Sequence, residues 1–74
     1  MEQLDCRGMR CPMPIVKLSM AIKGLYAGNE LTVTADDPAF RPDVEAWAKK
    51  TGNDLVSFDV VDGVAHAVVR KAVQ

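Results

Sequence analysis

The chain has 74 residues, 49% of them hydrophobic and 26% charged, which indicates a folded protein and excludes a disordered tail. Nine Lys and Arg against ten Asp and Glu leave a net charge of −1, so the composition provides no basic surface for nucleic acid. We expect one domain, residues 1–74, whose small core leaves little room for a deep pocket and favours a site on the surface.

The N-terminal residues and the length of the apolar stretches indicate a cellular compartment. Residues 1–5 are acidic without an apolar run, and no stretch approaches the ~20 apolar residues that span a bilayer. We therefore expect a cytoplasmic protein with no signal peptide and no contact with a membrane. Thiols in the cytosol are kept reduced, so Cys6 and Cys11 are more typical of reactive or metal-binding cysteines than of a structural disulfide.

The first half of the chain predicts a strand, a helix and a second strand. Residues 3–6 form the first strand, and residues 7–10 a polar loop. The apolar stripe of an amphipathic helix follows at steps of three and four: Ile15, Leu18, Ile22 and Leu25. We expect Gly28 to end this helix, and the alternation of apolar and polar residues over 31–35 indicates a half-buried strand.

A second helix is predicted after the turn at residues 36–38. Pro42 suits its first turn, where helix N–H groups have no internal partner, and Gly52 suits its end. One face of this helix carries the residues expected to pack on the core: Phe40, Val44, Trp47, Ala48 and Thr51.

The remaining residues predict a β-hairpin around Asp62-Gly63, a pair that suits a two-residue type I′ turn. Asp59 and His66 would then face each other on the outer side of the sheet. On the core side the turn predicts three cross-strand pairs: Val60–Ala65, Phe58–Ala67 and Val56–Val69.

The order of the predicted elements is β-α-β-α-β-β, which defines the expected fold class. Two helices cannot bury their apolar stripes on each other and also leave a sheet uncovered. The simplest arrangement is an α+β fold: a two-layer α/β sandwich with a four-stranded mixed sheet and both helices on one face.

The motif Cys11-Pro12-Met13-Pro14 opens the first helix and carries the strongest chemical signal. The unpaired N–H groups and the dipole of a helix start, roughly half a positive charge, favour a thiolate and predict a lowered pKa for Cys11. Arg7 and Arg10 would add positive charge if they fold towards the thiol. The alternative is an inert packing cysteine. The position of Cys11 between a polar loop and an apolar stripe argues for exposure and favours the reactive thiol.

Two segments of the chain resemble a known family. LDCRGMRCPMPIVKL is similar to the N-terminal signature of the TusA family, also called SirA-like or YeeD/YedF-like, in which Cys-Pro-x-Pro opens a helix. TADDPAFRPDVEAWAKKTG resembles the second segment of that family, in which an Asp-Asp-Pro turn leads into the second helix. The resemblance covers residues 4–70, and its fold is similar to the sandwich expected above.

This resemblance implies a function. It implies a sulfur carrier or sulfurtransferase that holds sulfane sulfur as a persulfide on Cys11 and passes it on, for tRNA thiolation or for sulfur oxidation. The donor would be a cysteine desulfurase or a rhodanese-like protein, and the acceptor a DsrE-like protein of a relay. Thiol exchange of this kind requires no metal and no other cofactor.

Other residues near the motif have two interpretations each. Cys6 is either a small residue facing the core or a resolving thiol for Cys11, and two cysteines with one His are too few for a standard zinc site. Gly8 suits a positive φ in the loop. A supporting or partner-binding role is open for the residues around the thiol: Arg7, Gly8, Arg10, Pro12, Met13 and Pro14.

Two other classes of function stay open at this point. A regulatory or binding module would use the open face of the sheet, although the charge and the lack of aromatic residues on the strands argue against RNA. A thiol redox protein would use Cys6 and Cys11, although their spacing is not that of a Cys-x-x-Cys motif.

Overall fold

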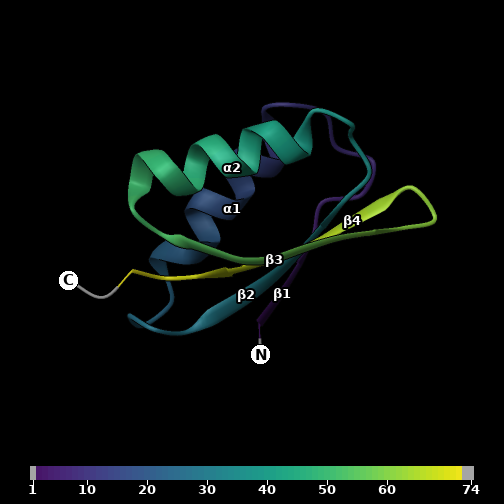
Figure 1. The fold of residues 1–74 in the computed structure, drawn as a ribbon. Helices are drawn as coiled ribbons and strands as arrows, with labels where there is room; N and C mark the ends of the chain where they lie inside the picture. The colour runs from purple at the N-terminus through teal and green to yellow at the C-terminus, as the bar shows by residue number, and fades with distance from the viewer. Residues whose placement is uncertain (1, 73–74) are drawn as a thin grey trace.

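The computed structural model describes residues 2–72, in which two helices cover one face of a sheet (Figure 1). The elements are β1 (Glu2–Asp5), α1 (Met13–Lys23), β2 (Glu30–Ala35), α2 (Phe40–Thr51), β3 (Asp54–Val61) and β4 (Val64–Arg70). The predicted β-α-β-α-β-β order and the two-layer α+β arrangement are confirmed.

The four strands form one mixed sheet in the order β1-β2-β4-β3. β1 pairs in parallel with β2, with Leu4 opposite Val33, and the connection between them contains α1, as a parallel pair requires a long crossover. β4 lies between β2 and β3 and pairs antiparallel with both. The topology therefore places the end of β1 and the end of β2 side by side, and the two loops that follow them meet at this edge of the molecule.

The hairpin turn has the predicted conformation. Asp62 and Gly63 have φ angles of 52° and 77°, and a type I′ turn needs a positive φ at both positions. Next to the turn, Val61 lies opposite Val64, and the register then matches the prediction in three pairs: Val60–Ala65, Asp59–His66 and Phe58–Ala67.

The last predicted pair of the hairpin is wrong. A β-bulge between Leu55 and Ser57 places Leu55, and not Val56, opposite Val69. The extra residue in a bulge is unpaired and reverses the alternation of faces beyond it. Val56 is accordingly 45% exposed, whereas Leu55 packs against the core.

The predicted end of the first helix is also wrong. α1 ends at Lys23, where the N–H of Gly24 donates to the carbonyl of Ala21 and the N–H of Leu25 to the carbonyl of Ile22, which closes the last turn. Gly28 lies in the following loop with a φ of 89°, and its N–H donates to the carbonyl of Lys71. α2 ends where predicted, at Gly52, which has the left-handed conformation.

The core lies between the helices and the sheet. Phe40 and Trp47 are 1% and 7% exposed, which confirms their predicted burial, whereas Thr51 is exposed. The buried hydrophobic residues are Cys6, Leu18, Ile22, Leu31, Val33, Ala35, Phe40, Val44, Trp47, Ala48, Ala65, Ala67 and Val69. Since both helices contribute to this cluster, their starts are fixed relative to each other, and this fixes the geometry of the site described next.

Candidate functional site

Cys11 lies at the exposed start of α1. Pro12 is the N-cap residue, joined to Cys11 by a cis peptide bond, and Met13 is the first helical residue. The thiol is free and exposed. The cysteine therefore stands next to the N-cap, as the sequence predicts, and can be reached from solvent.

The turn between β2 and α2 holds the loop that carries Cys11. The carboxylate of Asp36 accepts the N–H of Gly8 at 3.0 Å, and the carboxylate of Asp37 accepts the N–H of Cys11 at 2.6 Å. The second oxygen of Asp37 accepts the N–H of Ala39 at 3.1 Å, which shapes the turn itself. Figure 1 shows the two loops side by side at one end of the molecule. Backbone contacts from a separate segment thus fix the position of Cys11.

Asp43, in the first turn of α2, contacts the thiol directly. The Sγ atom of Cys11 donates to Oδ2 of Asp43 at 2.7 Å. This hydrogen bond, together with desolvation and the charges of Asp43 and Asp37, raises the pKa of the Cys11 thiol. The thiol in this structure is therefore a hydrogen-bond donor to a carboxylate.

The predicted lowering of the Cys11 pKa is thus wrong. The prediction rested on free N–H groups at the start of α1, but Pro12 and Pro14 have no N–H, and the N–H of Met13 donates to the carbonyl of Arg10 at 2.8 Å. The N–H of Cys11 itself is taken by Asp37. The carboxylate of Asp43 contacts the sulfur atom, and that of Asp37 contacts the N–H of the same residue, in place of a set of free donors.

The two arginines of the loop do not act alike. Arg7 forms a two-pronged ion pair with Asp5, with both N···O distances 2.9 Å, and this pair lowers the pKa of Asp5 and raises that of Arg7. Arg10 lies near Asp37 and helps to lower the pKa of that carboxyl, although the hydrogen bonds from Ala39 and Cys11 contribute more. The guanidinium of Arg7 is thus engaged by Asp5, while Arg10 balances a carboxylate of the site.

A groove of about 470 Å³ begins at Cys11 and runs between the two helices. Its polar residues include Ser19, whose hydroxyl accepts the indole N–H of Trp47 at 3.0 Å. The lining residues are Cys11, Pro12, Ile15, Ser19, Asp43, Ala46, Trp47, Lys50 and Thr51. The groove gives the thiol an adjacent, partly apolar surface.

Cys6 is fully buried, in contrast to Cys11. Its side chain is 0% exposed in the core, and its N–H donates to the carbonyl of Thr34 at 2.7 Å. Burial raises the pKa of the Cys6 thiol. The expectation that Cys6 is a small residue facing the core is confirmed by this placement.

The other residues named from the sequence surround Cys11 in different ways. Gly8 has a φ of 82°, as predicted, and no atom lies within 4 Å of the position that a Cβ would take. Met13 is 42% exposed, whereas Pro14 is buried. Of these two residues, only Met13 can therefore contact a partner protein.

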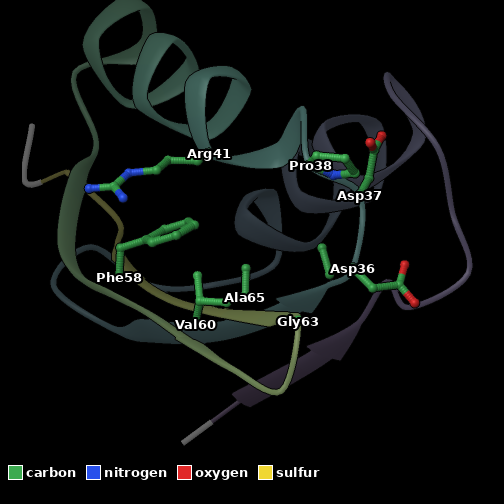
Figure 2. Close-up of a pocket in the computed structure, with 9 residues that line it drawn as sticks. Asp36, Asp37, Pro38, Arg41, Phe58, Val60, Gly63 and Ala65 are labelled. Carbon is green, nitrogen blue, oxygen red and sulfur yellow. The ribbon is translucent and has the colours of Figure 1, made fainter.

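A second cleft, of about 370 Å³, lies on the other side of the Asp36-Asp37 turn, under the start of α2. In Figure 2 Arg41 and Phe58 lie side by side at this cleft, and the guanidinium is 5.2 Å from the ring centre. The carboxylates of Asp36 and Asp37 point away from the cleft, towards the Cys11 loop. The Asp36-Asp37 turn thus borders both this cleft and the Cys11 loop, but its two carboxylates bond to the Cys11 loop.

The described part of the chain has neither a cluster of metal-binding side chains nor a membrane-spanning helix. Within residues 2–72 no three His, Cys, Asp or Glu side chains are grouped so that they could bind a metal ion. Neither helix in this range has the length and apolar character needed to cross a membrane.

Asp43 is, with Asp37, one of the two site residues whose role the sequence alone did not reveal. It stands three residues after Phe40 and four before Trp47, so it shares the helix face that those two buried residues define. An acidic residue on an inward-facing stripe was the available signal. What the sequence could not provide was the partner, because Cys11 is 32 residues away, in the loop just before the other helix.

This chain is similar to known proteins over nearly its whole length. The family model described as sulfurtransferase TusA matches residues 2–71. The sulfur carrier protein TusA of Allochromatium vinosum is 34% identical over 71 residues, which cover 96% of this chain and 93% of that protein. The crystal structure of a SirA-like protein from Desulfitobacterium hafniense superimposes with a TM-score of 0.86 at 26% identity, over 97% of this chain and 99% of that one.

Some relatives are longer than this chain. YrkF of Bacillus subtilis is 40% identical over 68 residues, which cover 92% of this chain but 37% of YrkF, and a relative from Aquifex aeolicus is matched over 35% of its length. The chain therefore spans about a third of these two proteins and nearly the whole of the Allochromatium protein. With a family match over residues 2–71 and the Cys-Pro-x-Pro motif at the start of α1, the chain belongs to the TusA family of sulfur carriers and sulfurtransferases.

Proposed function

We propose that this protein carries sulfane sulfur as a persulfide on Cys11 and transfers it to a partner protein. The observation that carries the proposal is the contrast between the two thiols. Cys11 is exposed at the family motif and Cys6 is fully buried, so one sulfur atom is placed for exchange. The groove between α1 and α2 gives a partner a surface to contact beside that atom.

Loading is a thiol–persulfide exchange. The thiolate of Cys11 attacks the outer sulfur of a donor persulfide, D–S–SH, and the S–S bond of the donor breaks as the S–S bond to Cys11 forms. The products are Cys11–S–SH and the donor thiolate D–S⁻. The sulfane sulfur moves with its proton, no electrons leave the pair of proteins, and no oxidant or reductant is consumed.

Unloading is the same exchange in the opposite sense. The thiolate of an acceptor cysteine attacks the outer sulfur of Cys11–S–SH, the S–S bond to Cys11 breaks, and Cys11–S⁻ leaves and takes a proton from solvent. Both steps bring another protein's cysteine to the surface of this chain. An open groove suits that encounter better than a closed pocket, which would exclude the partner's main chain.

The partners and the pathway are part of the proposal. We propose a cysteine desulfurase or rhodanese-like donor and a DsrE-like acceptor, with the sulfur destined for tRNA thiolation or sulfur oxidation. What supports a donor and an acceptor in general is that a relative of this chain, from Allochromatium vinosum, is named a sulfur carrier protein. Incubation of the loaded protein with candidate acceptors, followed by detection of sulfur on the acceptor cysteine, separates these destinations.

Intact-protein mass spectrometry after incubation with a sulfane-sulfur donor tests the carrier chemistry. The wild-type protein should gain one sulfur atom, Cys11→Ser none, and Cys6→Ala one. Alanine at position 6 serves as the control because it removes the second thiol without leaving a hydroxyl in the core. Equal loading of Cys11→Ser and wild type would overturn the proposal, and loading of none of the three proteins would favour a binding module.

A further inference from the structure

We propose that Asp43 is the positioning residue of Cys11, and that its carboxylate stabilises the discharged thiol relative to both the thiolate and the loaded persulfide. Asp43 would thereby set the direction of exchange towards release of sulfur. This inference rests on the proposed sulfur-carrier function and adds to it the residue that sets how strongly Cys11 retains its cargo.

The geometry makes Asp43 a fixed partner and not a passing contact. Its Oδ2 lies 2.7 Å from the Sγ of Cys11. On the side of α2, the neighbouring Val44 is fully buried and Trp47 is 7% exposed, so the helix face that carries Asp43 is held against the core. On the side of Cys11, the main chain is held by Asp37 through the 2.6 Å hydrogen bond to its N–H. Both ends of the Cys11–Asp43 contact are therefore anchored independently.

The charges that face the thiol come from three segments. Asp43 on α2 and Asp37 in the turn before it are the acidic groups that act on Cys11, and both raise its pKa. The basic groups nearby are Arg10, which acts on Asp37, and Lys50, which lines the groove. Asp36 in the same turn bonds to the N–H of Gly8 and is not among the groups that shift the pKa of Cys11. The group that contacts the sulfur atom directly is thus the carboxylate of Asp43.

The chemical consequence differs between the two states of the carrier. In the thiol form Cys11 has a proton on Sγ and donates it to Asp43. In the persulfide form Sγ is bonded to the outer sulfur, has no proton to donate, and loses this hydrogen bond. An ionised outer sulfur would also stand close to a negative carboxylate, which repels it. Reprotonation of Cys11–S⁻ after transfer restores the hydrogen bond, so Asp43 favours the discharged state.

The test measures the Cys11 pKa without any sulfur transfer. The rate of alkylation of Cys11 by iodoacetamide is followed against pH, by mass spectrometry of the peptide that contains Cys11, in wild type, Asp43→Asn and Glu45→Gln. Asp43→Asn removes the charge and keeps the shape. Glu45→Gln is the matched control, because it removes a charge from an exposed residue of the same helix that does not contact the thiol. We expect the pKa to fall in Asp43→Asn only. The thiolate fraction at pH 7 then rises about tenfold for each unit, and the rate rises about threefold because nucleophilicity falls with pKa.

A conservative variant separates a charge effect from a folding effect. Asp43→Glu keeps a carboxylate on the same helix face and should return the pKa towards the wild-type value. Circular dichroism of each variant establishes that it is folded before its profile is compared. If folded Asp43→Asn has the wild-type pH profile, the inference is overturned, whatever the outcome for sulfur loading.

A second measurement determines the fraction of each protein that is loaded with sulfur at equilibrium. Wild type and Asp43→Asn are equilibrated with glutathione persulfide and glutathione, and the loaded fraction is determined by intact mass. We expect a larger loaded fraction for Asp43→Asn than for wild type, and an equal or smaller fraction would overturn the inference. If wild type does not load at all, the proposed function fails, and the alkylation profile still decides whether Asp43 controls the thiol.

Discussion

The indole N–H of Trp47 donates to the hydroxyl of Ser19 at 3.0 Å, and this single hydrogen bond links α2 to α1 at the groove beside Cys11. Trp47 is 7% exposed, so water has limited access to its N–H if the hydroxyl is removed. The pair therefore contributes both to stability and to the spacing of the two helices that form the groove.

Replacing Ser19 with alanine should destabilise the protein. The indole N–H would lose its partner, and a largely buried unpaired donor costs about 1–3 kcal/mol. Since the groove edge is open to some water, we expect a value near the lower end, about 1 kcal/mol, in urea unfolding. Ser57→Ala, at an exposed position on β3, is the control and should change the free energy of unfolding by less than about 0.5 kcal/mol. Equal effects of the two substitutions would contradict this role for Ser19.

Gly8 and Gly24 form a matched pair for a test of backbone strain. Gly8 has a φ of 82° with open space around the Cβ position, whereas Gly24 has a φ of −84° and one carbonyl contact at an ordinary 3.6 Å. Gly8→Ala should therefore cost about 1–2 kcal/mol through strain alone. Gly24→Ala should be neutral or up to about 1 kcal/mol stabilising, because it restricts the unfolded chain. Thermal unfolding of the two variants side by side checks the prediction, and a stabilising Gly8→Ala would contradict it.

Much of the fold follows from local patterns in the sequence. The Asp62-Gly63 pair sets the hairpin turn, and with it the register of β3 against β4 as far as Phe58. Beyond that point a bulge breaks the alternation, and a run such as Leu55-Val56-Ser57 contains no signal that says which of its apolar residues turns inwards. The end of α1 illustrates the same limit, because Gly24 and Gly28 are both suitable helix stops and only the hydrogen bonds of the folded chain distinguish them.

The candidate site, like the fold, could be predicted from the sequence only in part. The position of Cys11 next to a helix start follows from the order of a polar loop, two prolines and an apolar stripe. Its electrostatic environment does not, because the groups that determine it, Asp37 and Asp43, lie 26 and 32 residues away. The local sequence suggested that free N–H groups at the helix start would lower the pKa of Cys11. In the folded chain the N–H groups of Cys11 and Met13 are already hydrogen-bonded, and the carboxylates of Asp37 and Asp43 lie close to Cys11.

The buried Cys6 should be unreactive while the protein is folded. We expect a disulfide reagent such as Ellman's reagent to modify one thiol quickly, at Cys11, and to modify Cys6 only at the rate at which the structure opens. Addition of urea above the unfolding midpoint should expose both. The Cys11→Ser variant is the control, in which the fast phase disappears. A Cys6–Cys11 disulfide that formed under mild oxidation, with the fold unchanged, would contradict this prediction and revive a redox role.

Two aspartates should make the stability sensitive to acid. The pKa of Asp5 is lowered mainly by its hydrogen bonds with Arg7, and that of Asp37 by the N–H groups of Ala39 and Cys11. A lowered pKa in the folded state means that folding favours the ionised form, so this contribution is complete above the ordinary value of 3.8 and is lost as the pH falls through the folded-state pKa. We expect the melting temperature to decrease below about pH 4, and to decrease less steeply in Asp5→Asn and Asp37→Asn than in wild type.

Asp54→Asn is the control for that experiment. Asp54 is exposed at the start of the edge strand β3, and it is distant in sequence from both Asp5 and Asp37. Its acid profile should follow that of the wild type. Asp37→Asn carries additional information, since Asp37 also holds the N–H of Cys11. If that hydrogen bond fixes the loop, amide exchange at Cys11 should accelerate in Asp37→Asn at neutral pH, and it should accelerate in wild type when the pH falls far enough to protonate Asp37. An exchange rate at Cys11 that is the same in wild type and Asp37→Asn would show that the loop is held by other contacts.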